Sequence, residues 1–323
     1  MSRFSAREAN APERSMHITC SFAGSDNASS AWALDLAAAL PEATVRAWEL
    51  GDPPADYAVV WKPTQAFIDS QTALKAIFNA GAGVDALAGL SLPTHVPLIR
   101  LEDAGMAEQM SDYVVHAVLH HFREFDGYAA QAALGSWMPR QPRRKAEFPV
   151  GILGFGVLGQ AVAKSLASLG FSVVAWANRP RPHSSIRVYS GAETLHEFLR
   201  ASRILVCLLP LTPATQRILN RAALGALRPD SYVINVARGG HLDVGALLAS
   251  IKDGHIAGAT LDVLEGEPIL SGDPIWTYPN IRITPHISAS TLRPDAVAQI
   301  AAKVRKLAMG EAVTGIVDRR RGY

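Results

Sequence analysis

The feature that most constrains this fold is a glycine-rich turn placed directly after a short apolar run. Val150 to Leu153 is predicted to be a buried strand, and a helix predicted to end near Leu169 begins within the turn. The turn consists of Gly154, Phe155, Gly156, Val157, Leu158 and Gly159. In this context the first glycine makes the tight turn, the second lets a pyrophosphate approach the backbone, and the third lets the helix pack on the strand. The start of the helix also offers N–H groups to phosphates. We therefore predict a dinucleotide site rather than a purely structural turn.

The residues after the next strand, Phe171 to Trp176, indicate which dinucleotide is bound. NAD sites carry an Asp or Glu there, about 20 residues beyond the glycines, to hold the ribose 2′-hydroxyl. Here the chain has Asn178, Arg179 and Arg181 and no carboxylate. A guanidinium can grip a 2′-phosphate with paired charged hydrogen bonds, whereas a carboxylate would repel it. NADP(H) is favoured and NAD(H) stays possible; the alternative is that both arginines belong to a solvated loop.

Around this unit the chain alternates short apolar runs with amphipathic stretches, which is typical of α/β proteins with parallel sheets. One long helix is expected from Gly105 to about Gln131, followed by a basic, proline-rich loop over 138–149. A last helix is expected over 294–309. Further elements are expected before residue 105, with strands at 17–22, 45–48, 57–61, 76–79 and 97–101 and a helix at 29–40.

Composition excludes several classes of protein. The 323 residues are 49% hydrophobic and 19% charged, with a net charge of +2, so we expect a globular protein and neither nucleic acid nor a membrane as partner. No apolar run reaches the roughly 18–20 residues that cross a bilayer.

Two cysteines, Cys20 and Cys207, lie in apolar runs, which favours the reducing cytoplasm over a disulfide framework. Residues 1–15 are polar, and we expect a disordered extension or a true start at Met16.

Three polar residues follow predicted strands of the second half of the chain, where open parallel sheets bind ligands. Arg238 follows the strand at 232–236, Glu267 the strand at 257–263, and His286 the strand at 281–284. Reduction of a 2-oxoacid needs a cation for the substrate's negative oxygens, a proton donor and a group that tunes the donor. A guanidinium suits the first role, imidazole the second, and a carboxylate bonded to the imidazole the third.

Taken singly, each of these residues has a simpler explanation, as a surface charge, a loop histidine or an exposed acid; only their joint placement favours catalysis. The histidines at 116, 120 and 121 include an i, i+4 pair that could hold a metal. No carboxylate or cysteine set accompanies them, so helix packing is favoured and no metal site is predicted.

The chain resembles the D-2-hydroxyacid dehydrogenase family, and within it most closely the type A glyoxylate/hydroxypyruvate reductases. The resemblance spans nearly all of 57–323. It is carried by ADYAVVWKP from Ala55, GAGVDAL from Gly81, RLEDAGMAEQM from Arg100, ILGFGVLGQ from Ile152, NVARGG from Asn235, LDVLEGEP from Leu261, TPHISA from Thr284 and DRRRGY from Asp318.

The resemblance implies Arg238 as substrate anchor, Glu267 as partner of the histidine and His286 as acid/base. It implies that the backbone N–H groups of Ala82, Gly83 and Val84 bind the substrate carboxylate, and it places Trp61 beside the substrate, although Trp61 could equally be a core residue. Glu265 is not expected to act, because the family's glutamate directly precedes a proline. Lys62 stands where the subgroup has a histidine, so that side of the pocket is expected to differ. Further cofactor contacts are expected from Leu209, Pro210, Ala237 and Asp262.

The resemblance also implies two doubly wound parallel-sheet domains with a cleft between them. The substrate domain is expected to comprise 16–105 and 290–323, and the dinucleotide domain 106–289. The long helix after Gly105 is the family's dimer-forming element, so a homodimer is expected. The implied activity is NADPH-dependent reduction of glyoxylate or hydroxypyruvate. Two alternatives remain: a related dehydrogenase acting on a bulkier hydroxyacid, or a non-catalytic nucleotide-sensing regulator on the same fold.

Overall fold

The computed structural model describes residues 16–23, 27–81, 83–87 and 89–321. The expected extension at 1–15 lies outside the described residues. The chain divides into two compact units. The first runs to Leu101 and resumes over Arg293–Val317, and the second comprises Glu102–Leu292 with the segment from Asp318 onward.

The first unit is a five-stranded sheet with the order β2-β1-β3-β4-β5, in which every neighbouring pair is parallel. Its elements are β1 (Met16–Phe22), α1 (Ala28–Ala39), β2 (Ala43–Ala47), β3 (Tyr57–Trp61), α2 (Gln65–Ser70), β4 (Ala76–Asn79), β5 (Leu98–Arg100) and α9 (Arg293–Ala308).

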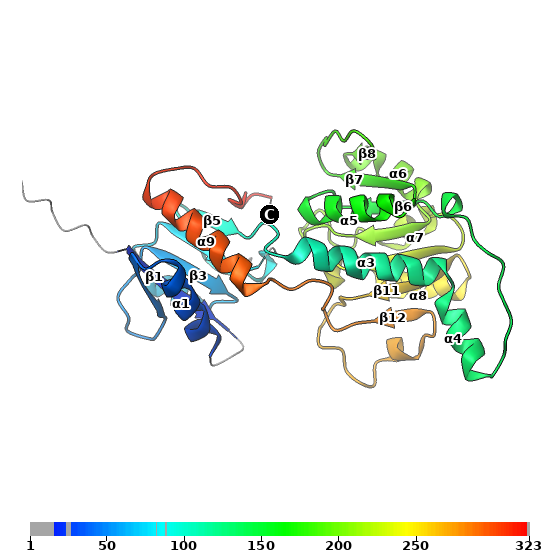
Figure 1. The fold of residues 1–323 in the computed structure, drawn as a ribbon, viewed down its shortest axis with the longest axis horizontal. Helices are drawn as coiled ribbons and strands as arrows, with labels where there is room; N and C mark the ends of the chain where they lie inside the picture. The colour runs from blue at the N-terminus through cyan, green and yellow to red at the C-terminus, as the bar shows by residue number, and fades with distance from the viewer. Residues whose placement is uncertain (1–15, 24–26, 82, 88, 322–323) are drawn as a thin grey trace, which may run out of the picture. The chain divides into compact units, whose positions relative to one another are not determined.

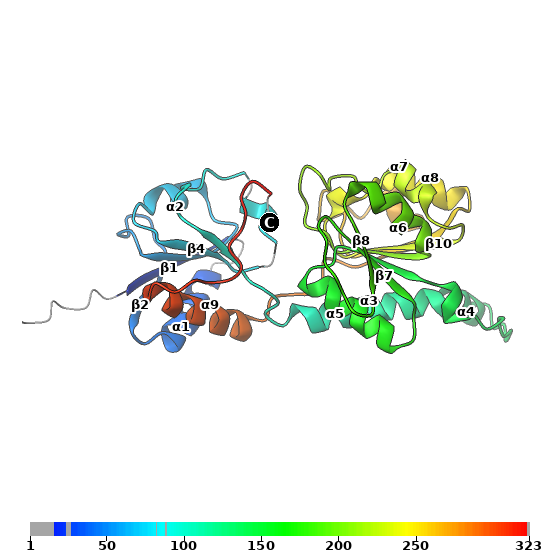
Figure 2. The same ribbon diagram turned by 90° about the horizontal axis from the view of Figure 1, so that it is seen from above.

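The apolar runs of the first unit form strands because they are covered on both faces. One face packs on α2, where Val60 and Ile77 contact a cluster that includes Phe67. Helices α1 and α9 lie together on the opposite face (Figures 1 and 2). The final helix, α9, is connected to the loop after α1 by an ion pair between Arg305 Nε and Glu42 Oε1 at 2.6 Å.

The second unit is a seven-stranded sheet with the order β12-β11-β10-β9-β6-β7-β8, again parallel throughout. Its elements are α3 (Met106–Phe122), α4 (Phe125–Ala133), β6 (Val150–Leu153), α5 (Val157–Ser168), β7 (Val173–Ala177), β8 (Arg187–Ser190), α6 (Leu195–Ala201), β9 (Ile204–Cys207), α7 (Arg221–Ala226), β10 (Ser231–Asn235), α8 (Val244–Lys252), β11 (Ile256–Leu261) and β12 (Ile281–Ile283). The predicted α/β class with two doubly wound parallel sheets is confirmed.

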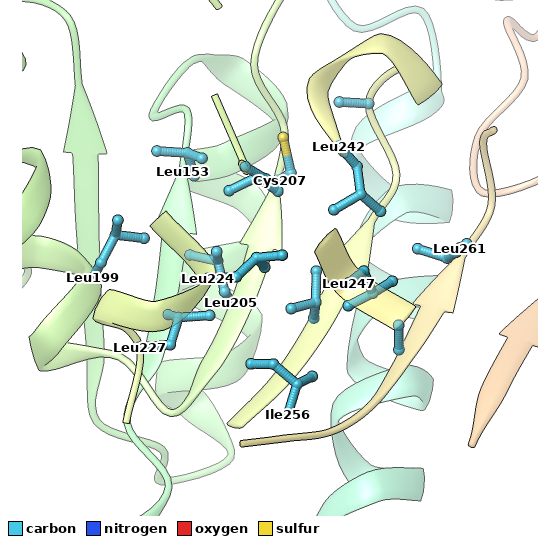
Figure 3. Packing of buried hydrophobic residues seen from close by; sticks show 14 of the residues in the cluster. Leu153, Leu199, Leu205, Cys207, Leu224, Leu227, Leu242, Leu247, Ile256 and Leu261 are labelled. Atoms are coloured by element: carbon cyan, nitrogen blue, oxygen red, sulfur yellow. The ribbon is translucent and has the colours of Figure 1, made fainter. Parts of the chain in front are cut away.

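Two apolar layers cover this sheet because successive side chains of a strand point to opposite faces. In β9, Leu205 and Cys207 join the layer under α6, α7 and α8 (Figure 3). Ile204 and Val206 join the opposite layer, under α3 and α5. Figure 2 shows these two sets of helices on opposite sides of the sheet. A strand buried on both faces consists of an unbroken apolar run, as β9 does.

The prediction of one long helix over 105–131 is wrong. The helix breaks between α3 and α4, where Glu124 adopts a left-handed backbone with φ of 56°. The Glu124 carboxylate lies 2.7 Å from Arg140 and 3.1 Å from Arg143. These ion pairs connect Glu124 to the extended segment after α4. Tertiary contacts therefore end the helix at a point where the periodicity of the sequence predicts that it continues. No helix in the described part of the chain is long and apolar enough to cross a membrane.

Candidate active site

The side chains singled out in the second half of the chain follow three neighbouring strands of the seven-stranded sheet. Arg238 follows β10, Glu267 follows β11 and His286 follows β12. Because these strands are parallel, their carboxyl ends lie at one edge, with about 4.8 Å between neighbouring strands. The glycine turn after β6 lies at the same edge.

His286 and Glu267 form a direct pair, with Nδ1 lying 2.9 Å from Oε2. A carboxylate only accepts hydrogen bonds, so Nδ1 carries the hydrogen and Nε2 is the nitrogen left for a ligand. Glu267 Oε1 accepts the backbone N–H of Leu264 at 2.8 Å, which holds the carboxylate in place. The His286 side chain is 41% exposed and therefore accessible to a small molecule. Glu265 points elsewhere and lies 3.5 Å from Arg217.

The turn that carries His286 is held by Asp262, at the end of β11. His286 has a left-handed backbone with φ of 57°, a strained conformation that costs about 1–3 kcal/mol for a residue with a side chain. Its N–H donates to the backbone carbonyl of Asp262 at 2.9 Å. The buried Asp262 carboxylate accepts the N–H groups of Ile287 and Ser288, both at 2.8 Å, and the Thr284 hydroxyl at 2.6 Å. The expected contact of Asp262 with a cofactor stays a prediction, but the carboxylate already holds this turn.

Arg238 is positioned by two buried polar residues that our sequence analysis did not identify. Asn235 Oδ1 accepts the N–H of Ala237 at 3.2 Å, and its Nδ2 donates to the Arg238 carbonyl at 3.1 Å. His241 Nδ1 lies 3.2 Å from the Arg238 backbone nitrogen. Both residues are completely buried. A polar residue at the end of an apolar run, as Asn235 is, was the available signal.

Gly239 lets two of the three loops approach each other. A Cβ at this position would lie 2.0 Å from the Leu264 carbonyl carbon and 2.2 Å from the Glu265 nitrogen, distances that no side chain can occupy. The loop after β10 therefore packs backbone to backbone against the loop that carries Glu267. This contact connects the surroundings of Arg238 to those of the Glu267–His286 pair.

The three glycines of the turn after β6 have the distinct environments that a dinucleotide site requires. Gly154 has φ of +113°, and Gly159 packs so closely that a Cβ would lie 2.0 Å from the Gly154 carbonyl oxygen. At Gly156 a Cβ would meet nothing within 4 Å, which leaves open space at the start of α5. Among the described residues, no side chain caps this helix start. These residues fit a cofactor pyrophosphate, because the site presents N–H groups and a cradle without side chains.

The residues expected around the rest of a cofactor lie on the same edge of the sheet. Asn178, Arg179 and Arg181 follow β7 and are exposed, and neither guanidinium forms an ion pair with the described residues. Leu209 is buried and Pro210 exposed, both in the loop after β9. Ala237 is buried beside Arg238. Within the glycine turn, Phe155 is buried, whereas Val157 is exposed and Leu158 half-buried.

The remaining predicted residues belong to the first unit. Ala82 lies outside the described residues. Asn79, at the end of β4, donates from Nδ2 to the carbonyl oxygens of Gly81 at 2.8 Å and Gly83 at 2.9 Å, and so shapes the turn that continues to the buried Val84. The half-buried Trp61 lies against this turn: a Cβ on Gly81 would be 2.4 Å from its ring.

The three histidines of α3 have different neighbours. His120 pairs with Asp126 at 3.0 Å, and its ring contacts His116. His121 stacks on Tyr232 with ring centroids 4.2 Å apart, and burial lowers its pKa to about 4. No group of three or more His, Cys, Asp or Glu among the described residues is arranged to hold a metal ion.

The chain is similar to known 2-hydroxyacid dehydrogenases in both sequence and fold. The model of the D-isomer specific 2-hydroxyacid dehydrogenase NAD-binding domain matches residues 115–288. Glyoxylate/hydroxypyruvate reductase A of Yersinia enterocolitica is 43% identical over 299 residues, covering 90% of this chain and 96% of that protein. The protein of the same name from Escherichia fergusonii is 44% identical over 300 residues, with the same coverage.

Two solved structures have the same fold. A D-isomer specific 2-hydroxyacid dehydrogenase from Xanthobacter autotrophicus, in complex with NADPH and MES, superposes with a TM-score of 0.89 at 39% identity, covering 94% of this chain and 99% of that one. The NADPH-dependent glyoxylate/hydroxypyruvate reductase of Sinorhizobium meliloti, in complex with NADP and sulfate, gives 0.88 at 32% identity, covering 95% and 100%.

Proposed function

This chain belongs to the D-isomer specific 2-hydroxyacid dehydrogenase family, and from that premise we propose that it reduces small 2-oxoacids with NADPH. The products would be glycolate from glyoxylate and D-glycerate from hydroxypyruvate. The observation that carries the proposal is the 2.9 Å pair of His286 and Glu267, on the same sheet edge as Arg238 and the glycine turn.

His286 serves as the proton donor. With Nδ1 bonded to Glu267, the Nε2–H of the imidazolium is the hydrogen available to a substrate oxygen. As the keto group is reduced, its carbon–oxygen double bond becomes a single bond and the oxygen gains negative charge. Transfer of the Nε2 proton to that oxygen gives the 2-hydroxyacid. Glu267 accepts the Nδ1–H hydrogen bond and keeps the ring oriented.

Arg238 serves as the permanent cation of the site. Its guanidinium cannot lose its charge at neutral pH, so it attracts the substrate carboxylate and stabilises the negative oxygen that develops. Asn235 and Gly239 hold its backbone, so the charge is provided by a fixed loop rather than a mobile one.

NADPH, when bound, supplies the hydride that reduces the keto carbon. The glycine turn would hold its pyrophosphate, and Arg179, Arg181 and Asn178 its 2′-phosphate. Leu209, Pro210, Ala237 and Asp262 complete the proposed set of contacts. The exposed guanidinium groups after β7 and the absence of a carboxylate among residues 178–181 support NADPH over NADH.

In the first unit, we propose that Gly83 and Val84 bind the substrate carboxylate through backbone N–H groups; the predicted contribution of Ala82 falls outside the described residues. Consecutive N–H groups in a glycine-containing turn form an anion site. The bonds from Asn79 that shape this turn support the assignment, and so does the packing of Trp61 against it. Trp61 would then limit the size of the substrate side chain.

The decisive experiment measures NADPH and NADH oxidation with glyoxylate, hydroxypyruvate and bulkier 2-oxoacids. We expect the highest kcat/KM with NADPH and the two small acids. His286→Ala should lower kcat by at least about 10³-fold, because it removes the proton donor, while the NADPH Kd from fluorescence titration stays within about twofold. Near-normal turnover by His286→Ala would falsify the role of the histidine, and preference for a bulky acid would identify a different dehydrogenase of the family.

The assembly we propose is a homodimer formed through α3, α4 and the segment that follows. Leu134, Trp137 and Met138 are 83%, 97% and 65% exposed, and such apolar exposure is typical of a surface covered by another copy. Light scattering should give twice the chain mass, and Trp137→Ser should shift the protein toward monomer. An unchanged dimer would place the interface elsewhere.

Both cysteines are buried free thiols, which supports the cytoplasm as the compartment.

A further inference from the structure

The bonds that hold the His286 turn continue to helix α3. Tyr113, on α3, places its Oη 2.5 Å from Thr284 Oγ1. Thr284 Oγ1 in turn lies 2.6 Å from Asp262 Oδ1. Thr284 is two residues before His286, so the chain of three side chains ends at the turn that carries the proposed proton donor.

The direction of these hydrogen bonds follows from the carboxylate. Asp262 accepts two backbone N–H groups, so it acts as an acceptor and the Thr284 hydroxyl must donate its single hydrogen to Oδ1. Thr284 Oγ1 is then the acceptor for Tyr113, whose phenol donates. Burial raises the pKa of Tyr113, so its hydroxyl keeps its hydrogen at neutral pH.

We propose that Tyr113 and Thr284 are positioning residues for His286, acting through Asp262. The carboxylate of Asp262 can bind the N–H groups of both Ile287 and Ser288 only in one orientation. Tyr113 and Thr284 fix that orientation from the side of Oδ1. The two N–H bonds in turn keep His286 in its strained left-handed conformation, which aims the ring at Glu267. This inference rests on the proposed function of His286.

A second tyrosine–threonine pair provides a matched control. Tyr232 Oη lies 2.9 Å from Thr260 Oγ1, in the same unit and between adjacent strands. It is buried more deeply than the Tyr113–Thr284 pair, and no hydrogen bond of the described residues connects its hydroxyl groups to Asp262. Removing the hydrogen bond between Tyr232 and Thr260 therefore shows how much a bond of this kind contributes to folding stability, without an effect on the His286 turn.

The test compares Tyr113→Phe, Thr284→Val and Thr284→Ser with Tyr232→Phe in the full-length protein. We expect kcat to fall about tenfold in Thr284→Val and about threefold in Tyr113→Phe, with the KM for the oxoacid within about twofold, because small misplacements of a reacting group lower the rate steeply. Thr284→Ser keeps the hydroxyl and should restore kcat to within about twofold of the wild type. Tyr232→Phe should keep wild-type kcat, even if it lowers Tm.

Amide hydrogen exchange provides a readout that does not depend on turnover. The N–H groups of Ile287 and Ser288 should exchange about tenfold faster in Thr284→Val than in the wild type, and at the wild-type rate in Tyr232→Phe. Unchanged exchange in Thr284→Val overturns the inference, and so does a loss of kcat that Thr284→Ser fails to restore. A wild-type protein without turnover would refute the proposed function instead, and the exchange rates would still decide whether Tyr113 and Thr284 hold the turn.

Discussion

The stability of the second unit should depend on His121 as the pH falls. This ring stacks on Tyr232, and its Nε2 is buried without a hydrogen-bond partner among the described residues. Burial lowers its pKa to about 4, compared with about 6.5 in an unfolded chain, and the positive charge of Arg143 adds to the shift. The folded protein therefore resists protonation of His121, whereas the unfolded chain accepts the proton readily.

The sign and the size of the effect follow from these two pKa values. Above pH 6.5 His121 is neutral in both states and costs nothing. Below pH 6.5 the unfolded chain binds a proton that the folded one does not, so stability falls as the pH falls. The penalty reaches about 2 kcal/mol at pH 5 and about 3 kcal/mol at pH 4, and it levels off below pH 4, where the folded state is protonated as well.

Replacement of His121 by phenylalanine keeps an aromatic ring on Tyr232 and removes the titrating group. Lowering the pH from 7 to 5 should therefore reduce Tm by about 4–8 °C less in His121→Phe than in the wild type, taking about 2–4 °C per kcal/mol for a domain of this size. Scanning calorimetry of the second unit's transition measures this difference. The same replacement at the exposed His196 controls for the added apolar ring. Identical pH dependence in the wild type and His121→Phe would refute the reasoning.

Three further predictions concern the site. Gly239→Ala should lower kcat by at least about tenfold together with Tm, since its Cβ would overlap the backbone at Leu264; wild-type kinetics would show that the two loops can separate freely. Arg181→Ala should raise the KM for NADPH about 10–100-fold and leave that for NADH unchanged, as expected for loss of one charged hydrogen bond; equal effects on both cofactors would contradict a 2′-phosphate contact. Glu267→Gln should lower kcat about 10²-fold with little effect on the NADPH Kd, and kinetics within twofold of the wild type would remove Glu267 from the mechanism.

Much of the fold was predictable because its strands are buried on both faces. Runs such as Val150–Leu153 consist entirely of buried residues, so their sequence alone separates them from the amphipathic helices. The break at Glu124 was not predictable in this way. It depends on ion pairs with Arg140 and Arg143, which lie beyond the following helix, and local periodicity contains no information about such contacts.

The same distinction holds for the candidate site, where the proposed catalytic residues were predictable and the long-range contacts that orient them were not. Arg238, Glu267 and His286 could be identified because each lies within a few residues of the end of an apolar run, and parallel topology brings such positions to one edge. The choice of Glu267 over Glu265 came from the family resemblance. The hydrogen bonds that orient His286 could not be identified in this way. Asp262 binds residues 25 and 26 positions away, and Tyr113 reaches Thr284 across 171 positions. These bonds exist only once the strands are arranged, so no spacing in the sequence reports them.

A parallel sheet brings strand ends within about 5 Å of each other, but it does not aim their side chains. In this protein the side chains are oriented by contacts between neighbouring loops. Gly239 joins the loop after β10 to the loop after β11, and Asp262 joins the end of β11 to the turn after β12. A substitution at either of these contacts should therefore reduce turnover while the sheet persists. These contacts connect each loop to the next. A substitution at Gly239 and a substitution at Asp262 should therefore each disturb the Glu267–His286 pair, although neither residue bonds to the imidazole.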